Sequence, residues 1–376
     1  MTTLKRICAA FLMLSISLLL LTSCLSYRDL DHVVFVTSIL IDKDEDDNMV
    51  FYFETLNAIR SSSKGANQEK RIVYKITNKN AADAINSLEA RTSVPISLAH
   101  NKVILFTEKF SRSGLDLVFD LFDRWQESVN RTLLCIYDGD PKDFIKPTNQ
   151  EENMTGLYLY SMLGNKKSVT SYGVKINIKE FMNQKYIGDK VNSLPIITVS
   201  KDEDTKGQYY INGVGLVKEY KMVGRLDKEQ TYYFNLLLNN QVDGNINTAN
   251  PEDETKLVSM LLLKNNYDSD LELENNDLNV TIKLRLNTVI SSIQGELELT
   301  KANIGKLQDS MAETIEENCL KLFQEWKDKK IDVFDIQEKF DRKYPSEAGR
   351  NIIEDSKLRM DVQVEINGTS SVRDAE

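Results

Sequence analysis

The sequence predicts a multidomain α+β protein, built from mixed, mainly antiparallel sheets with packed helices. Three observations predict this class. Short β-branched runs alternate with helical patterns through the first half of the chain. Apolar and polar residues alternate strictly at 280–286 and 358–366, which is typical of strands with one buried and one wet face. A stripe of apolar residues at helical spacing runs from Leu307 to Trp326 and predicts a helix about 30 Å long.

Composition sets the size of the protein and argues against several function classes. The chain has 376 residues, of which 41% are hydrophobic and 28% charged, as expected for two or three folded domains. Its net charge of −10 lacks the basic footprint of a nucleic-acid-binding protein. The two histidines, His32 and His100, and the four cysteines form no cluster with zinc-ligand spacing. We therefore expect no nucleic acid, no metal, no cofactor and no catalytic residues.

Residues 1–23 have the form of a lipoprotein signal peptide. Lys5 and Arg6 precede an apolar run that is too short for a confident membrane span. Leu21-Thr22-Ser23-Cys24 then resembles the lipobox of bacterial lipoproteins, in which the leader is cut just before a cysteine that carries a diacylglycerol. We expect cleavage between Ser23 and Cys24, and lipidation of Cys24 that holds the body on the outer face of the membrane. The alternatives are an uncleaved anchor helix, or a secreted protein in which Cys24 is incidental.

Residues 24–200 are predicted to form an N-terminal mixed α/β region of one or two subdomains. Asn80 is a good N-cap for a helix whose apolar face includes Ala84 and Leu88. From 142 to 190 the patterns weaken. Strands are predicted from apolar or alternating runs, and helices from apolar spacing, over these ranges: strands at 33–41, 50–56, 71–76, 102–106 and 132–137, and helices at 81–88, 115–125 and 154–163.

A charged, polar stretch from Lys201 to Gly207 is the predicted domain boundary. The C-terminal domain is then expected over 207–372, with strands at 209–218 and 221–226 around a turn. A long helix laid across a mainly antiparallel sheet is the simplest way to bury the patterns that follow. We interpret the apolar stripe as core, rather than as a cofactor site or a partner-binding helix. Its members are Leu307, Met311, Ile315, Cys319, Leu322, Phe323 and Trp326.

Several short motifs resemble ligand sites but do not complete the pattern. Asp42, Asp44 and Asp46 match the first ligand positions of a calcium loop, yet its sixth position lacks glycine and its twelfth lacks glutamate, so a hairpin turn is predicted. Gly213-Val214-Gly215 lacks the third glycine of a dinucleotide-binding loop and indicates a close approach of strands instead. His100 precedes a strand, where a structural hydrogen-bonding role is favoured.

The cysteines do not predict a disulfide. Cys8 leaves with the leader and Cys24 is blocked by lipid, so Cys135 and Cys319 remain. Both lie in apolar patterns and are predicted to be small buried hydrophobes.

Taken in order, several segments resemble the Ger(x)C family, the C subunits of bacterial spore nutrient-germinant receptors. The likeness covers nearly all of the mature chain and is thinnest over 142–200. The family often has an aromatic residue after the lipid cysteine, where this chain has Leu25, and glycines after an Asp-x-Phe element, where it has Asp335 and Gln337. The matching segments are Tyr27-Arg28-Asp29-Leu30, Val33–Ile41, Ile41-Asp42-Lys43, Ala81–Arg91, His100–Leu105, Gly213–Lys218, Lys221–Asp227, Asp332-Val333-Phe334, Phe340, Arg342-Lys343-Tyr344-Pro345 and the strand before Asn367-Gly368.

The resemblance implies a non-enzymatic, lipid-anchored subunit. Family members sit on the outer face of the spore's inner membrane and work with two integral-membrane partners, an A subunit and a transporter-like B subunit. Known family structures are described as three mixed α/β domains. Two other classes stay open from the residues alone: a substrate-binding lipoprotein of an importer, which usually has two doubly wound lobes, and an envelope hydrolase, which needs an activated nucleophile or a carboxylate pair in a cleft.

Overall fold

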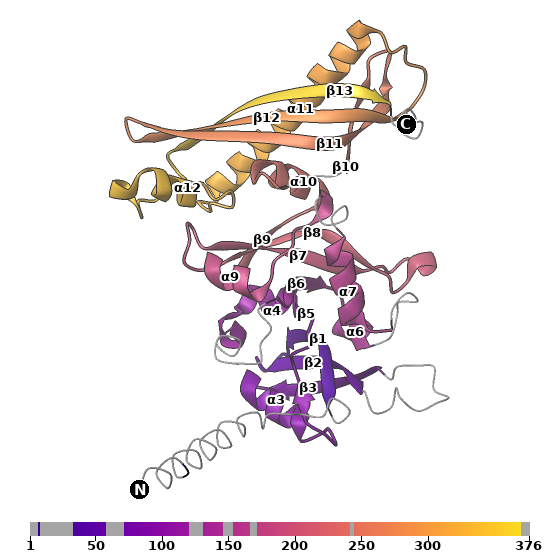
Figure 1. Cartoon of the computed structure of the whole chain (residues 1–376), viewed down its shortest axis with the longest axis vertical. Helices are drawn as coiled ribbons and strands as arrows, with labels where there is room; N and C mark the ends of the chain where they lie inside the picture. The colour runs from indigo at the N-terminus through magenta and orange to yellow at the C-terminus, as the bar shows by residue number, and fades with distance from the viewer. Residues whose placement is uncertain are drawn as a thin grey trace.

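The computed structural model describes Ile7 and residues 33–57, 71–119, 131–145, 153–165, 171–240 and 244–369. Ser23, Cys24 and His32 lie outside the described residues, as does the second half of the helix predicted at 115–125. Figure 1 shows a large sheet with helices around it through the lower and middle parts of the molecule, and a second sheet with a long helix at the top.

The large sheet has strand order β3-β2-β1-β5-β6-β7-β8-β9, with the short β4 paired to β1. Its centre is parallel, since β1, β5, β6 and β7 pair in parallel, while the outer pairs are antiparallel. Parallel strands are covered on both faces, and the five residues from Leu133 to Tyr137 are accordingly all buried. The bounds are β1 Val34–Lys43, β2 Met49–Asn57, β3 Arg71–Asn78, β4 Ile96–Ser97, β5 Val103–Thr107, β6 Leu133–Asp138, β7 Val191–Val199, β8 Tyr209–Lys218 and β9 Lys221–Leu226.

Helices cover both faces of this sheet. On one face, α3 (Ala81–Glu89), α4 (Glu108–Ser113) and α9 (Ile178–Gln184) supply Leu88, Phe110 and Phe181 to one core cluster. On the other face, α6 (Pro141–Ile145) and α7 (Thr155–Gly164) supply Phe144 and Leu159 to a second cluster. The predicted N-cap Asn80 accepts a hydrogen bond from the backbone N–H of Ala82 at 2.8 Å.

The second sheet has strand order β10-β11-β12-β13, over Gly244–Asn250, Asp253–Glu274, Asp277–Ile293 and Ser356–Thr369. Its first two pairings are antiparallel and β12 pairs with β13 in parallel. The helix α11 (Lys301–Asp328) crosses one face, as Figure 1 shows. All seven residues of the apolar stripe on α11 are buried, so its interpretation as core is confirmed. The remaining elements are α10 (Lys228–Leu237), α12 (Ile336–Lys343) and two single-turn 3₁₀ helices at Glu203–Thr205 and Pro345–Glu347.

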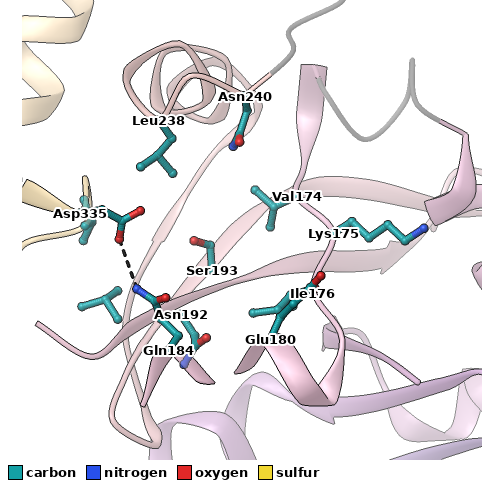
Figure 2. A pocket seen from close by; sticks show the side chains of 12 residues that line it. Val174, Lys175, Ile176, Glu180, Gln184, Asn192, Ser193, Leu238, Asn240 and Asp335 are labelled. Atoms are coloured by element: carbon teal, nitrogen blue, oxygen red, sulfur yellow. Dashed lines mark hydrogen bonds between the residues drawn. The ribbon is translucent and has the colours of Figure 1, made fainter. Parts of the chain in front are cut away.

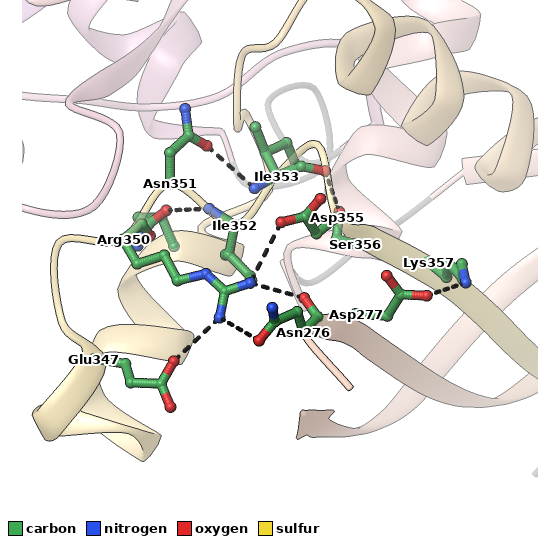
Figure 3. Close-up of polar contacts among 11 residues, drawn as sticks. Asn276, Asp277, Glu347, Arg350, Asn351, Ile352, Ile353, Asp355, Ser356 and Lys357 are labelled. Carbon is green, nitrogen blue, oxygen red and sulfur yellow. Dashed lines mark hydrogen bonds and ion pairs between the residues drawn. The ribbon is translucent and has the colours of Figure 1, made fainter. Parts of the chain in front are cut away.

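The far end of the β11–β12 hairpin is tied to the segment that leads into β13. Asn275 and Asn276 have φ of 50° and 77°, the left-handed backbone that a tight two-residue hairpin turn requires. Figure 3 shows the Arg350 guanidinium between Asn276, Glu347 and Asp355, with its Nη2 donating to the Asn276 carbonyl at 2.9 Å. An ion pair between Asp277, the first residue of β12, and Lys357 on β13 lies beside it. The turn end of this hairpin is therefore tied to the segment before β13 and to the start of β13.

The α+β class with a long C-terminal helix on a sheet is confirmed. The predicted boundary at 201–207 falls in the hairpin that joins β7 to β8, and the sheet continues across it, because Thr198 pairs with Tyr210. The division into two domains at this point stays a prediction. The strand β7, the helix α10 and the strands β10 and β11 were not predicted.

Candidate functional site at the joint between the two sheets

Strand β8 belongs to the large sheet but contributes to all three core clusters formed by the described residues. Tyr209 and Ile211 pack on the α7 face, and Val217 packs on the α9 face. Val214 and Leu216 pack with the residues of α11 and the second sheet. The joint between the two halves is therefore a shared hydrophobic core, formed where β8 and β9 meet α10 and α11.

Three glycines of this joint allow close approach, as Gly213-Val214-Gly215 predicted. Gly213 has φ of +94°, and a Cβ there would lie 2.0 Å from the Leu226 carbonyl oxygen. A Cβ on Gly215 would lie 2.2 Å from Cδ1 of Ile136 on β6. On β9, a Cβ on Gly224 would lie 2.4 Å from the indole of Trp326. Contacts below 3 Å are too short for any side chain, so these positions need glycine.

Trp326 occupies the space that Gly224 leaves. Its side chain is fully buried in the last turn of α11, and the Lys329 ammonium lies 4.1 Å from its ring centroid. Fully burying a large aromatic side chain is among the larger stabilising contributions that one residue makes. The α11 helix is thereby fixed on β9 and on the large sheet.

A polar network crosses the same joint. Lys218 on β8 donates to Oδ1 of Asp189 at 2.6 Å, and the backbone N–H of Asp332 donates to Oδ2 of Asp189 at 2.9 Å. The Asp332 carboxylate in turn accepts hydrogen bonds from the backbone N–H groups of Phe334 and Gln337 at 3.0 and 2.6 Å. The turn between α11 and α12 is therefore held by one buried carboxylate and docked on the loop before β7.

The two carboxyl groups of this turn are protonated more readily than usual. Burial raises the pKa of Asp332 to about 7, although its two backbone hydrogen bonds act in the opposite direction. Burial also raises the pKa of Asp335 to about 6, with a further contribution from the negative charge of Glu338. These groups change charge close to neutral pH, which an ordinary aspartate does not do.

A cavity of about 230 Å³ opens beside this turn. Figure 2 shows Asp335 at one side of it, accepting a hydrogen bond from Gln184 Nε2 at 3.3 Å. The lining combines elements from both halves of the chain: Val174, Lys175, Ile176, Glu180, Gln184, Val191, Asn192, Ser193, Leu238, Asn240, Val333 and Asp335. The lining includes the polar side chains Ser193, Lys175 and Glu180 beside Asp335, and it contains no cysteine or histidine.

The remaining candidate residues have structural surroundings. Cys135 and Cys319 are separate, buried thiols, and burial raises the pKa of each, so neither is a reactive thiolate. Asp44 accepts from the backbone N–H groups of Asp46 and Asn48, which confirms the hairpin turn. The His100 ring packs edge to face on Phe35 at 4.7 Å. Within the described part of the chain, no group of three or more His, Cys, Asp or Glu residues could hold a metal.

A second polar cluster was not predicted. The Glu54 side chain is completely buried on β2 and accepts from Thr37, Ser38 and Arg71, the last at 2.5 Å. It also accepts from the backbone N–H groups of Thr155 and Gly156 at 2.8 Å, at the N-terminus of α7. The carboxylate thereby ties α7 to the strands β1 and β2. A single glutamate at the end of the apolar run Val50–Phe53 does not reveal these partners in the sequence.

Two family models of known proteins match this chain. Residues 26–199 match the family model described as "Spore germination protein N-terminal domain". Residues 212–373 match the model described as "Spore germination B3/ GerAC like, C-terminal". Together the two matches cover most of the chain, and they meet at the β7–β8 hairpin.

Individual proteins similar to this chain are also named as spore germination proteins. The chain is 23% identical over 235 residues to the spore germination protein GerQC of Bacillus cereus, covering 62% of this chain and 61% of that protein. It is 21% identical over 288 residues to the putative spore germination protein YfkR of Bacillus subtilis, covering 74% and 73%. The match therefore spans about three fifths of the length of the first of these relatives.

The fold has a counterpart among solved structures. The crystal structure of the GerBC protein superposes with a TM-score of 0.59 at 16% identity, covering 88% of this chain and 96% of that one. This likeness concerns the fold. Among the helices of the described residues, none combines the length and apolar character that crossing a membrane requires.

Proposed function

Because this chain belongs to the Ger(x)C family of spore germination proteins, we propose that it is the lipid-anchored C subunit of a spore germinant receptor. It works with integral-membrane A and B subunits and has no chemistry of its own. Its place is the outer face of the membrane, which in spores is the inner membrane. The carrying observation is the order of parts: the lipobox-like Leu21–Cys24 stands immediately before the first family domain, and the second family domain follows it.

The composition of the joint supports a binding or scaffolding role rather than catalysis. Two segments that carry the resemblance, Gly213–Lys218 and Asp332–Phe334, supply close packing and a buried turn. The two described sheets also differ from the pair of doubly wound lobes that an importer's binding protein usually has, since only the first has a parallel centre.

Lipid attachment is tested by metabolic labelling with a fatty-acid probe. The wild-type chain should be labelled and processed, and Cys24→Ala should be neither, because the thiol that accepts the lipid is gone. Cys8→Ala is the matched control, since it removes a cysteine of the same leader and should leave labelling intact. Equal labelling of the wild type and Cys24→Ala would refute the anchor.

The receptor role is tested by deletion. Spores that lack this chain should lose the response of its own receptor, because the subunits act as a complex, and they should keep responses that pass through other receptors. Complementation by the wild type should restore the response and Cys24→Ala should restore it poorly. An unchanged response in the deletion strain would contradict the proposal.

A further inference from the structure

The large sheet carries an exposed aromatic and apolar surface at the end where its parallel strands begin. We call this end the N-terminal edge of the sheet. The parallel strands β1, β5, β6 and β7 all start at this edge. The strand register can be followed from β1 to β7 through the pairs Ser38–Val103, Val103–Leu133 and Ile136–Ile196. Along the strand direction, the first residue of β7 therefore lies within about two residues of the first residue of β1. The chain enters the body and passes from α9 into β7 at the same edge.

We define the edge patch as Leu117, Lys185, Tyr186 and Tyr220. Tyr186 is 76% exposed and Leu117 is 63% exposed, both high values for large apolar side chains. The Lys185 ammonium lies 5.3 Å from the Tyr186 ring centroid and 5.2 Å from that of Tyr220. The backbone N–H of Leu115 donates to the Tyr220 carbonyl at 2.9 Å, which brings the turn that carries Leu117 to the same place.

The edge patch rests on a rigid base. The rings of Phe119 and Phe181 stack with their centroids 4.2 Å apart. The Tyr220 ring centroid lies 5.7 Å from that of Phe119 and 6.2 Å from that of Phe181. Both phenylalanines are fully buried. The packed aromatic rings therefore fix the position of the exposed side chains relative to the sheet.

The position of the lipidated residue limits how far the membrane can be. Nine steps along the chain separate Cys24 from Val33, which no backbone conformation can stretch beyond about 32 Å. The bilayer surface must therefore pass within that distance of the N-terminal edge of the sheet. Tyrosine, together with lysine whose stem lies on apolar surface, is typical of the boundary between headgroups and acyl chains.

We infer that the edge patch lies in the headgroup region of the lipid bilayer and sets the orientation of the anchored body. This inference rests on the proposed lipidation of Cys24. The acidic Asp116 and the Glu219–Lys190 pair near it leave the patch without a strong positive charge, so the acyl chains hold the protein on the membrane and the patch orients it. In Figure 1 the strands β7, β8 and β9 run across the long axis of the molecule, so this contact lays that axis along the membrane.

The orientation is tested by tryptophan quenching in the lipidated full-length chain. Tyr186→Trp is compared with Tyr210→Trp, which replaces another exposed tyrosine near the opposite end of the sheet, and the parent chain supplies the background of Trp125 and Trp326. Vesicles of phosphatidylcholine and phosphatidylglycerol contain phosphatidylcholine brominated near the headgroup. We expect the added fluorescence of Tyr186→Trp to fall at least twofold and that of Tyr210→Trp to stay unchanged.

Flotation of the same samples separates the two proposals. If the wild-type chain floats with vesicles while Tyr186→Trp is unquenched, or quenching is equal at both positions, the orientation is wrong and the anchor stands. If the wild-type chain is neither labelled by lipid nor found with vesicles, the proposed function fails and the orientation falls with it. Shielding of Tyr186→Trp only when the integral-membrane subunits are present would assign the patch to a protein partner and overturn the lipid contact.

Discussion

At Asp335 the backbone takes a conformation that glycine adopts more easily than aspartate. Its φ of 57° lies in the left-handed region, which glycine adopts freely and an aspartate adopts at a cost of about 1–2 kcal/mol. Asp335 is also the residue before α12, and its side chain makes no capping hydrogen bond there. Asp335 is therefore a point of local backbone strain at the joint.

Replacing this residue should stabilise the protein. Asp335→Gly is expected to raise the free energy of unfolding by about 1 kcal/mol at pH 7.5, because it relieves the backbone and removes a partly buried charge. Urea denaturation measures the change. Asp335→Ala is the matched control, since it removes the same carboxylate without relieving φ. Equal stability of the two variants would show that the backbone is not strained.

Glu54 makes the opposite contribution, because its charge is fully satisfied. Burial opposes its ionisation, but Arg71 and the hydrogen bonds from Gly156 and Ser38 outweigh burial and leave its pKa lowered. A lowered pKa in the folded state stabilises the protein above the unfolded pKa, and this stability is lost as pH falls through the folded value. The cluster should therefore weaken in acid.

The Glu54→Gln variant tests this contribution. It should cost about 3–5 kcal/mol at pH 7, because it leaves the Arg71 charge buried without its partner. The difference between wild type and variant should shrink as the pH approaches 3. Denaturation in urea across this range measures it, with the exposed Glu45→Gln as a control that changes little. A constant difference at all pH values would contradict the charged state of Glu54.

At the scale of elements, the turn from Asp332 to Gln337 links the two halves of the protein through groups that titrate near neutrality. Asp332 has a raised pKa, so its contribution to stability is complete below the unfolded value of about 3.9 and is lost as pH rises toward about 7. The charged groups that act on Asp332 are Asp335 and Asp189. Asp189 pairs with Lys218, and Asp335 lies close to Glu338 and Lys339.

Asp332→Asn should flatten this pH dependence. The wild type is expected to lose stability relative to the variant between about pH 4 and 7, because its unfolded chain releases the Asp332 proton in this range while the folded protein still holds it. Urea midpoints at several pH values measure the slope, and Asp361→Asn on the exposed side of β13 is the control that keeps the wild-type slope. A variant whose slope equals that of the wild type would rule out Asp332 as the titrating group.

Sequence patterns predicted the elements whose side chains follow one period. The strands β1, β2, β3, β5 and β6 and the helix α11 lie where their apolar residues indicated. The strand β7 was missed because Val191-Asn192-Ser193-Leu194-Pro195 mixes polar residues with a proline, and the structure tolerates this proline at a bulge between Pro195 and Ile197. The long strand β11 was missed because it is largely polar from Lys264 onward and is held by β12 and by the contacts of Arg350 and Lys343.

The joint itself was only partly predictable. Gly213-Val214-Gly215 indicated close approach, and the apolar stripe ending at Trp326 indicated a core helix. That Gly224 faces Trp326 depends on how the two halves pack, which neither segment shows alone. The burial of Asp332 and Asp335 has the same origin, since a short acidic turn usually predicts an exposed loop.

At the scale of the whole molecule, β8 and β9 make the two halves dependent on each other. These two strands lie in the second family match and pair into the large sheet of the first. Removing the second sheet and α11 would expose their Val214, Leu216 and Leu226, which are now fully buried in the common core. The interface between the two halves is one continuous apolar core. Interfaces between independently folded domains are usually more polar. The two family domains are therefore expected to unfold as one cooperative unit.

Native-state hydrogen exchange measures this coupling. The slowest amides of β5 in the first half and β12 in the second should report the same free energy of opening. Trp326→Ala should lower both by about 3–5 kcal/mol, because it empties the contact between α11 and Gly224 on β9. Val223→Ala, beside it on the exposed side of β9, is the control and should lower neither by more than about 0.5 kcal/mol. A loss confined to β12 would mean that the first half is stable alone, and the two regions would then be separate folding units joined at the β7–β8 hairpin.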